Sequence, residues 1–173
     1  MISNKKIKGI SLGTVDNEMS PILRAWRNDP KIYRWSRQND LLTEACHAQW
    51  MKIQQEQSKS VIYLIRDGNT PVGVCGFSNI DLINQRAEFS VYIGPEYHRQ
   101  GYGKDALKLL IWHGFNNYPF NIIYGETFHG NPALKLFESL GFALEGFRRE
   151  AYFKDGDFID SNLISIKRGE FKL

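Results

Sequence analysis

The sequence that decides this fold reads Glu88-Phe89-Ser90-Val91-Tyr92-Ile93-Gly94-Pro95-Glu96-Tyr97-His98-Arg99-Gln100-Gly101-Tyr102-Gly103-Lys104. It begins as a β-like run, passes through a loop broken by Pro95, and reaches two glycines just before an apolar helix. This order predicts several free backbone N–H groups at a helix N-terminus, where the helix dipole favours an anion. Gly101 and Gly103 carry no Cβ, so a ligand can approach the backbone closely. The stretch therefore predicts a phosphate or diphosphate site.

Two common phosphate-binding motifs fit this loop poorly. A P-loop needs a hydroxyl where Asp105 stands and a glycine where His98 stands. The dinucleotide fingerprint G-x-G-x-x-G/A does match residues 101–106, and Glu126 follows at a plausible distance. In that fingerprint, however, the first glycine ends the strand directly, whereas residues 95–100 intervene here. A third possibility is the spacing x-x-x-G-x-G/A between a strand and a helix, and a fourth is an ordinary glycine-rich helix start.

Composition is that of one ordinary globular unit, and we expect a single domain over residues 1–173. The net charge is +3, and no basic block occurs, which disfavours a nucleic-acid partner. Cys46 and Cys75 have no C-x-x-C spacing and no histidine cluster beside them, so we expect two free, buried thiols, no metal and a cytoplasmic location. No long apolar segment predicts a secretory signal or a membrane span.

The apolar pattern along the chain predicts an α/β fold. Strand-like segments occur at residues 7–13, 61–65, 71–77, 80–83, 87–93, 122–127, 142–147 and 159–166. Helix-like segments occur at 20–28, 31–38 (a short helix or a turn), 43–57, 103–117 and 131–140. This order predicts a mixed central sheet, antiparallel at the start, flanked by helices, with one right-handed parallel crossover near the middle.

Two motifs in the right order resemble the Gcn5-related N-acetyltransferases (GNAT). Arg99-Gln100-Gly101-Tyr102-Gly103 is similar to the acyl-CoA signature of that family, and the block from Asn131 to Phe142 resembles its next motif. The tail from Phe142 to Asp160 and the start Trp26-Arg27-Asn28-Asp29-Pro30 look like RimJ/RimL-type members. Within that group the chain looks most like PseH-type enzymes, which N-acetylate a UDP-linked amino-dideoxy sugar on the way to pseudaminic acid and flagellin glycosylation.

The resemblance implies direct attack of an amine on acetyl-CoA, the expected co-substrate. The diphosphate would lie on the backbone of His98, Arg99, Gln100, Gly101, Tyr102, Gly103 and Lys104. The acyl arm would follow Val91, Tyr92 and Ile93, and a backbone N–H near Tyr92 or Ile93, freed by a strand bulge, would polarise the thioester oxygen. Asn131 and Phe137 would complete the cofactor site.

The same resemblance suggests residues for proton transfer and for the acceptor. Glu126 is the leading candidate base, and His47 is the second, as a relay or a substrate contact. Arg27, Ser78, Asn79 and Arg149 are candidates for substrate binding, the arginines because their guanidinium groups suit phosphates. Each of these side chains could equally serve packing or solvation alone.

One departure from the family pattern concerns the leaving thiolate. Many members carry Tyr where this chain has Phe137, which cannot donate a proton. Either another donor serves, such as Tyr124 or water, or the thiolate leaves unprotonated. We expect a nucleotide-linked amino sugar as the acceptor. A ribosomal-protein N-terminus or a polyamine is the alternative, and a CoA-binding module without turnover is a reading of another class. The sequence allows a homodimer without requiring one.

Overall fold

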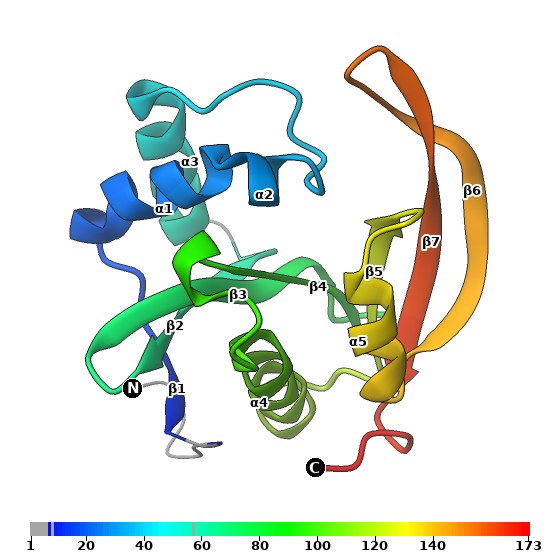
Figure 1. The fold of residues 1–173 in the computed structure, drawn as a ribbon. Coiled ribbons are helices and arrows are strands. Elements are labelled where there is room, and N and C mark those ends of the chain that lie inside the picture. Colours follow the sequence, from blue (N-terminus) through cyan, green and yellow to red (C-terminus); the bar gives the residue numbers. More distant parts are fainter. Residues whose placement is uncertain (1–6, 8, 57) are drawn as a thin grey trace.

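A computed structural model describes residues 7, 9–56 and 58–173, and it is built on one seven-stranded sheet (Figure 1). The strand order is β1-β2-β3-β4-β5-β7-β6, and only the β4–β5 pair is parallel among the described strands. The strands are β1 (Ile10–Gly13), β2 (Val61–Asp67), β3 (Thr70–Asp81), β4 (Arg86–Ile93), β5 (Ile122–Phe128), β6 (Ala143–Lys154) and β7 (Asp157–Lys167). The expectation of a mixed, partly antiparallel sheet flanked by helices is confirmed.

Helices cover both faces of the first half of the sheet (Figure 1). The helices are α1 (Ser20–Asn28), α2 (Pro30–Tyr33), α3 (Glu44–Glu56), α4 (Tyr102–Asn117) and α5 (Ala133–Ser139), with short 3-10 turns η1 (Asn17–Met19) and η2 (Pro95–Tyr97). In the described part of the chain no helix is both long and apolar enough to span a bilayer.

Local sequence explains where several helices begin and end. The side chain of Asp29 accepts a hydrogen bond from the N–H of Lys31, and Pro30 fits the first turn of α2. The hydroxyl of Thr43 accepts from the N–H of Cys46 at the start of α3. Gly141, with φ 94°, ends the α5 segment in the left-handed conformation that glycine adopts without strain.

Strand β4 separates two hydrophobic clusters, because neighbouring side chains on a strand point to opposite faces. Val91 and Ile93 pack with the cluster that contains the buried face of α4. Tyr92 packs with the other cluster, which holds residues of α1, α2 and α3. The strand that the sequence singled out therefore lies between the two helical layers.

Two segments differ from the sequence-based expectation. Residues 80–83 do not form a strand of their own: Ile80 and Asp81 end β3, and Leu82 and Ile83 lie exposed in the turn that follows. The last two strands are longer than predicted and form an extended hairpin that projects from the sheet (Figure 1). Alternation of apolar residues did not reveal this length because most of β6 is exposed.

Candidate active site

The sheet opens between β4 and β5. Their parallel pairing ends at Glu88 and Tyr124, although β4 continues to Ile93 and β5 to Phe128 (Figure 1). Beyond that point the backbone N–H and C=O groups that face the gap have no strand partner across it. Unpaired strand edges in the middle of a sheet can bond an extended ligand in place of a strand.

Strand alternation decides which backbone groups face this gap. The N–H of Gly94 donates to the C=O of Val72, a residue of β3. The register between β3 and β4 has no shift from Ile93 to Glu88. Along a strand, successive backbone N–H groups point alternately to the two neighbouring strands. The N–H of Tyr92 therefore points to β3, as that of Gly94 does, whereas the N–H groups of Val91 and Ile93 point into the gap. The expected bulge near Tyr92 is wrong: the parting of β5, not a bulge, frees these groups.

The loop before α4 has the geometry of an anion site. Gly101 is the N-cap of α4 with φ 90°, and a Cβ added there would meet nothing within 4 Å. Arg99 also adopts a positive φ of 61°, and the ring of His98 bonds the C=O of Ile93 at 2.8 Å. These conformations turn the loop so that it follows directly on the open edge of β4.

One predicted amide of this loop is already occupied. The N–H of Lys104 donates to the C=O of Gly101 at 3.0 Å, so it belongs to the first helical turn rather than to a ligand. Tyr102 and Gly103 occupy the first two helical positions, whose N–H groups have no acceptor inside a helix. The amides left for an anion are therefore those of Tyr102, Gly103 and the residues just before them.

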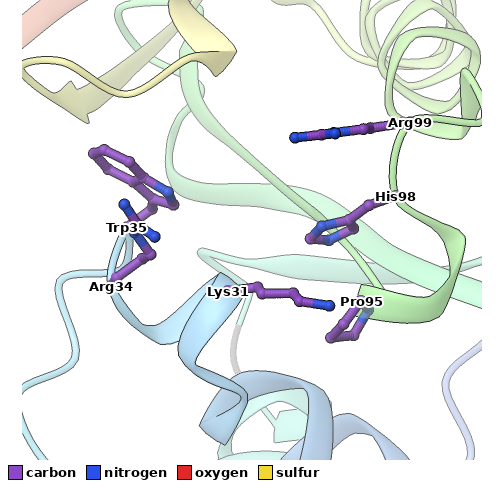
Figure 2. A pocket seen from close by; sticks show the side chains of 6 residues that line it. All are labelled: Lys31, Arg34, Trp35, Pro95, His98 and Arg99. Carbon is purple, nitrogen blue, oxygen red and sulfur yellow. The ribbon is translucent and has the colours of Figure 1, made fainter.

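A pocket of about 490 Å³ lies between this loop and α2. Figure 2 shows Lys31, Arg34 and Trp35 on the side of α2, facing Pro95, His98 and Arg99 across the opening. No acidic side chain lines it. Lys31, Arg34 and Arg99 are exposed and have no ion pair among the residues that the structure describes.

A buried carboxylate that sequence reasoning missed lies at the point where the strands part. Glu88 is 6% exposed, and it forms an ion pair with Arg37. Its other oxygen accepts a hydrogen bond from the amide of Asn79 at 2.7 Å. The amide nitrogen of Asn79, a predicted substrate-binding residue, is therefore engaged by Glu88. The signal in the sequence was an acid placed between Ala87 and Phe89 in an otherwise apolar strand.

Glu126, the predicted base, is on β5 just beyond the last residue pair with β4. Arg148 of β6 donates to one carboxylate oxygen at 3.0 Å, and the hydroxyl of Ser161 donates to the other at 2.5 Å. The structure thus places Glu126 at the gap with both oxygens engaged. Each carboxylate oxygen can accept two hydrogen bonds, so each still has capacity for a further donor.

Three other predicted residues come together away from Glu126. The guanidinium of Arg27, a residue of α1, lies 5.6 Å from the ring centre of Tyr92. His47 on α3 is 1% exposed, and its Nδ1 shares a hydrogen bond with the hydroxyl of Ser20 at 2.7 Å. Burial, followed by the charges of Arg24 and Arg27, lowers the pKa of His47. His47 is therefore packed between helices and does not line the pocket described above.

The other predicted site residues either contact neighbouring residues of the fold or lie outside the pocket. Phe137 is buried against Phe89 and Phe142, with ring centres 5.2 and 6.1 Å away. The side chain of Asn131 accepts from the N–H of Ala133 at the start of α5. Ser78 pairs with Glu88 in the β3–β4 ladder, and Arg149 is exposed on β6 outside the pocket.

A second missed residue, Lys154, holds the segment that carries Trp35. Lys154 ends β6, is 4% exposed, and donates to the C=O groups of Ser36 and Gln38 at 3.0 and 2.6 Å. Its ammonium also lies 3.9 Å from the ring centre of Tyr33. We call residues 34–43 the strap, because they run from α2 to α3 over the gap side of the sheet. In the sequence this lysine looks like any surface lysine beside a turn.

No group of three or more His, Cys, Asp or Glu side chains suitable for a metal occurs in the described part of the chain. Cys75 is buried but Cys46 is exposed, so the expectation of a buried thiol is wrong for Cys46. Among the described residues, four buried side-chain atoms have no hydrogen-bond partner: Gln38 Oε1, His47 Nε2, Tyr92 Oη and Asn162 Nδ2. Burial raises the pKa of Tyr92, so this phenol stays protonated.

Comparisons of this chain with a family model and with curated proteins agree on one family. The family model described as "Acetyltransferase (GNAT) domain" matches residues 14–143. The uncharacterized N-acetyltransferase p20 of Bacillus licheniformis is 30% identical over 116 residues, which cover 66% of this chain and 65% of that protein. The spermidine N(1)-acetyltransferase of Escherichia coli K12 is 27% identical over 147 residues, 83% of this chain and 72% of that protein.

A solved structure shares the fold at low sequence identity. It is the spermidine N-acetyltransferase of Vibrio cholerae in complex with CoA and spermine, with a TM-score of 0.89 and 19% identity. The superposition covers 94% of this chain and 97% of that one.

Proposed function

Because the chain belongs to the GNAT family of acetyl-CoA-dependent N-acetyltransferases, we propose that it acetylates a primary amine on a small acceptor. One observation carries this proposal: the open edge of β4 leads directly to the free amides at the start of α4. A diphosphate suits those amides and the helix dipole behind them. The N–H and C=O groups of Val91 and Ile93 suit the amide groups of a pantetheine arm lying in the gap.

The reaction that follows from this geometry is a direct transfer. The lone pair of a neutral amine attacks the thioester carbon, the C–S bond breaks, and the sulfur leaves as thiolate. An N–H of Val91 or Ile93 would stabilise the negative charge that develops on the carbonyl oxygen. The amine loses one proton, which Glu126 would accept, directly or through water.

The leaving thiolate needs a donor other than Phe137, whose ring is buried and has no proton to give. Tyr124 is at the end of the β4–β5 pairing. Burial and then the nearby carboxylate of Glu88 raise the pKa of Tyr124, which keeps its phenol protonated at neutral pH. We therefore place Tyr124, or solvent, in the role of general acid.

Two acceptors are candidates. A polyamine is supported by the spermidine acetyltransferase of Escherichia coli, which aligns over 83% of this chain. The nucleotide-linked amino sugar of the sequence-based expectation, with its pseudaminic-acid setting, has no support from the relatives reported above. One observation favours this second candidate: the pocket beside the loop is lined by cations and by no acid.

Release of CoA thiol in the presence of an amine panel tests the proposal. The panel contains spermidine, a UDP-linked 4-amino sugar and a peptide with a free N-terminus. We expect at least one amine to stimulate thiol release with formation of the N-acetyl product. Tight CoA binding without stimulation by any amine would favour the non-catalytic CoA-binding reading instead.

A further inference from the structure

The cations across the pocket from the α4 loop have no assigned task. Lys31 is in the last turn of α2, and Arg34 follows that helix directly. Both are exposed, and both line the pocket that Arg99 closes from the other side (Figure 2). Unneutralised charges of one sign around a concave site raise the local potential and attract the opposite sign.

In the described part of the chain no acid near the opening forms an ion pair with Lys31 or Arg34. Glu96 accepts a hydrogen bond from the indole N–H of Trp26, and Asp29 accepts one from the backbone N–H of Lys31. Glu88 is bound by Arg37 and Asn79, and Glu126 is bound by Arg148 and Ser161. Neither carboxylate lines the pocket. A polycation placed there would meet like charges and no carboxylate in the pocket lining.

The two walls of the pocket are suited to different ligands. The wall formed by residues 95–99 leads into the amides that suit the diphosphate of acetyl-CoA. The wall formed by α2 is on the other side of the opening (Figure 2). It also carries Trp35, whose ring lies 5.0 Å from the guanidinium of Arg34 and offers a flat surface for a sugar or a base.

We infer that Lys31 and Arg34 form an anion subsite for the acceptor, so that the acceptor is an amine that also carries a phosphate or a carboxylate. This inference rests on the proposed acetyl transfer and narrows its substrate class. Arg34 supplies a planar fork for two oxygens, and Lys31 supplies a point charge. The phosphate of a sugar ester and the diphosphate of a nucleotide sugar share this chemistry.

Matched amine pairs test the inference directly. Thiol release is compared for glucosamine and glucosamine 6-phosphate, for ethanolamine and phosphoethanolamine, and for spermidine against a UDP-linked 4-amino sugar. We expect kcat/KM to favour the anionic partner by about tenfold or more, the factor that a hydrogen bond to a charged group contributes. The advantage should shrink as salt screens the charges.

A double variant, Lys31→Gln with Arg34→Gln, should remove this advantage while the KM for acetyl-CoA stays within about twofold, since the diphosphate binds the opposite wall. Lys52→Gln with Lys59→Gln is the matched control, because it removes the same charge from exposed positions outside the pocket. A preference for spermidine would overturn the inference. So would a variant that raises the KM for acetyl-CoA and treats both members of each pair alike.

Binding separates this inference from the proposed function. If no amine is acetylated, calorimetry with CoA-saturated protein measures whether glucosamine 6-phosphate and a UDP-linked 4-amino sugar bind. Binding that the double variant loses, and the control variant keeps, supports the subsite even though the transfer reaction is refuted. Absence of binding by both probes overturns the subsite.

Discussion

Lys154→Met tests whether the strap depends on one buried ammonium. The substitution keeps most of the side-chain volume but removes the donor that serves Ser36 and Gln38. The buried carbonyl of Ser36 and the partly buried carbonyl of Gln38 then lose their partner, at about 1–3 kcal/mol each if water does not replace it. The substitution also removes the cost of burying the ammonium charge of Lys154, which offsets part of this loss. We expect a net loss of about 2 kcal/mol, which for a chain of this size lowers Tm by roughly 4–8 °C.

The strap carries Arg34 and Trp35, so the variant should also affect the acceptor. We expect a higher KM for the amine and an unchanged KM for acetyl-CoA, because the cofactor loop does not contact Lys154. Lys59→Met is the control, since an exposed lysine contributes within about 0.5 kcal/mol. Thermal unfolding and steady-state kinetics give both quantities. A Tm equal to that of the parent protein, or an equal rise in both KM values, would refute the role given to Lys154.

Three further predictions concern the loop, the base and a buried histidine. Gly101→Val should weaken CoA binding strongly, because valine disfavours φ 90° and its side chain would project into the open space that we assign to the diphosphate. Calorimetry with CoA measures this affinity, and an affinity equal to that of the parent protein would remove the loop from the site. Glu126→Gln should lower turnover by about 10²-fold or more at unchanged CoA affinity if Glu126 is the base; full activity from pH 6 to about pH 9 would exclude that role. For His47 the folded-state pKa lies below the ordinary 6.5, so the unfolded chain binds the proton first and stability falls as pH drops through about 6.5. Urea unfolding between pH 8 and about pH 5 should therefore give a free energy of unfolding that depends less on pH in His47→Gln, by up to about 1.4 kcal/mol per pH unit. Burial also lowers the pKa of His113, which adds a slope of the same sign in both proteins. Identical curves for the two proteins would argue against a buried neutral His47.

The elements of the fold could be predicted because their signals are local. A glycine pair before an apolar periodic run placed α4, and Gly141 placed the end of the α5 segment. The family assignment followed from two motifs at the right separation. The homodimer and the roles of the site residues stay predictions, since no observation here tests them.

What could not be predicted depends on contacts between distant residues. Lys154 reaches the strap 116 and 118 residues earlier in the chain, and Arg37 reaches Glu88 across 51 residues. A single sequence carries no period or motif for such pairs. The burial of His47 could not be predicted for the same reason: its place between α1 and α3 depends on Ser20, whose sequence position indicated only a helix start.

The short parallel ladder has a mechanical consequence. Three residue pairs join β4 to β5, and beside them the N–H groups of Asn121 and Ile122 donate to the C=O of Gln85. A molecule bound along the opening would act as an eighth strand and fasten the halves together. Substrate would then be a structural component for part of each cycle, and amide hydrogens of residues 89–93 and 125–128 should exchange more slowly whenever it is present.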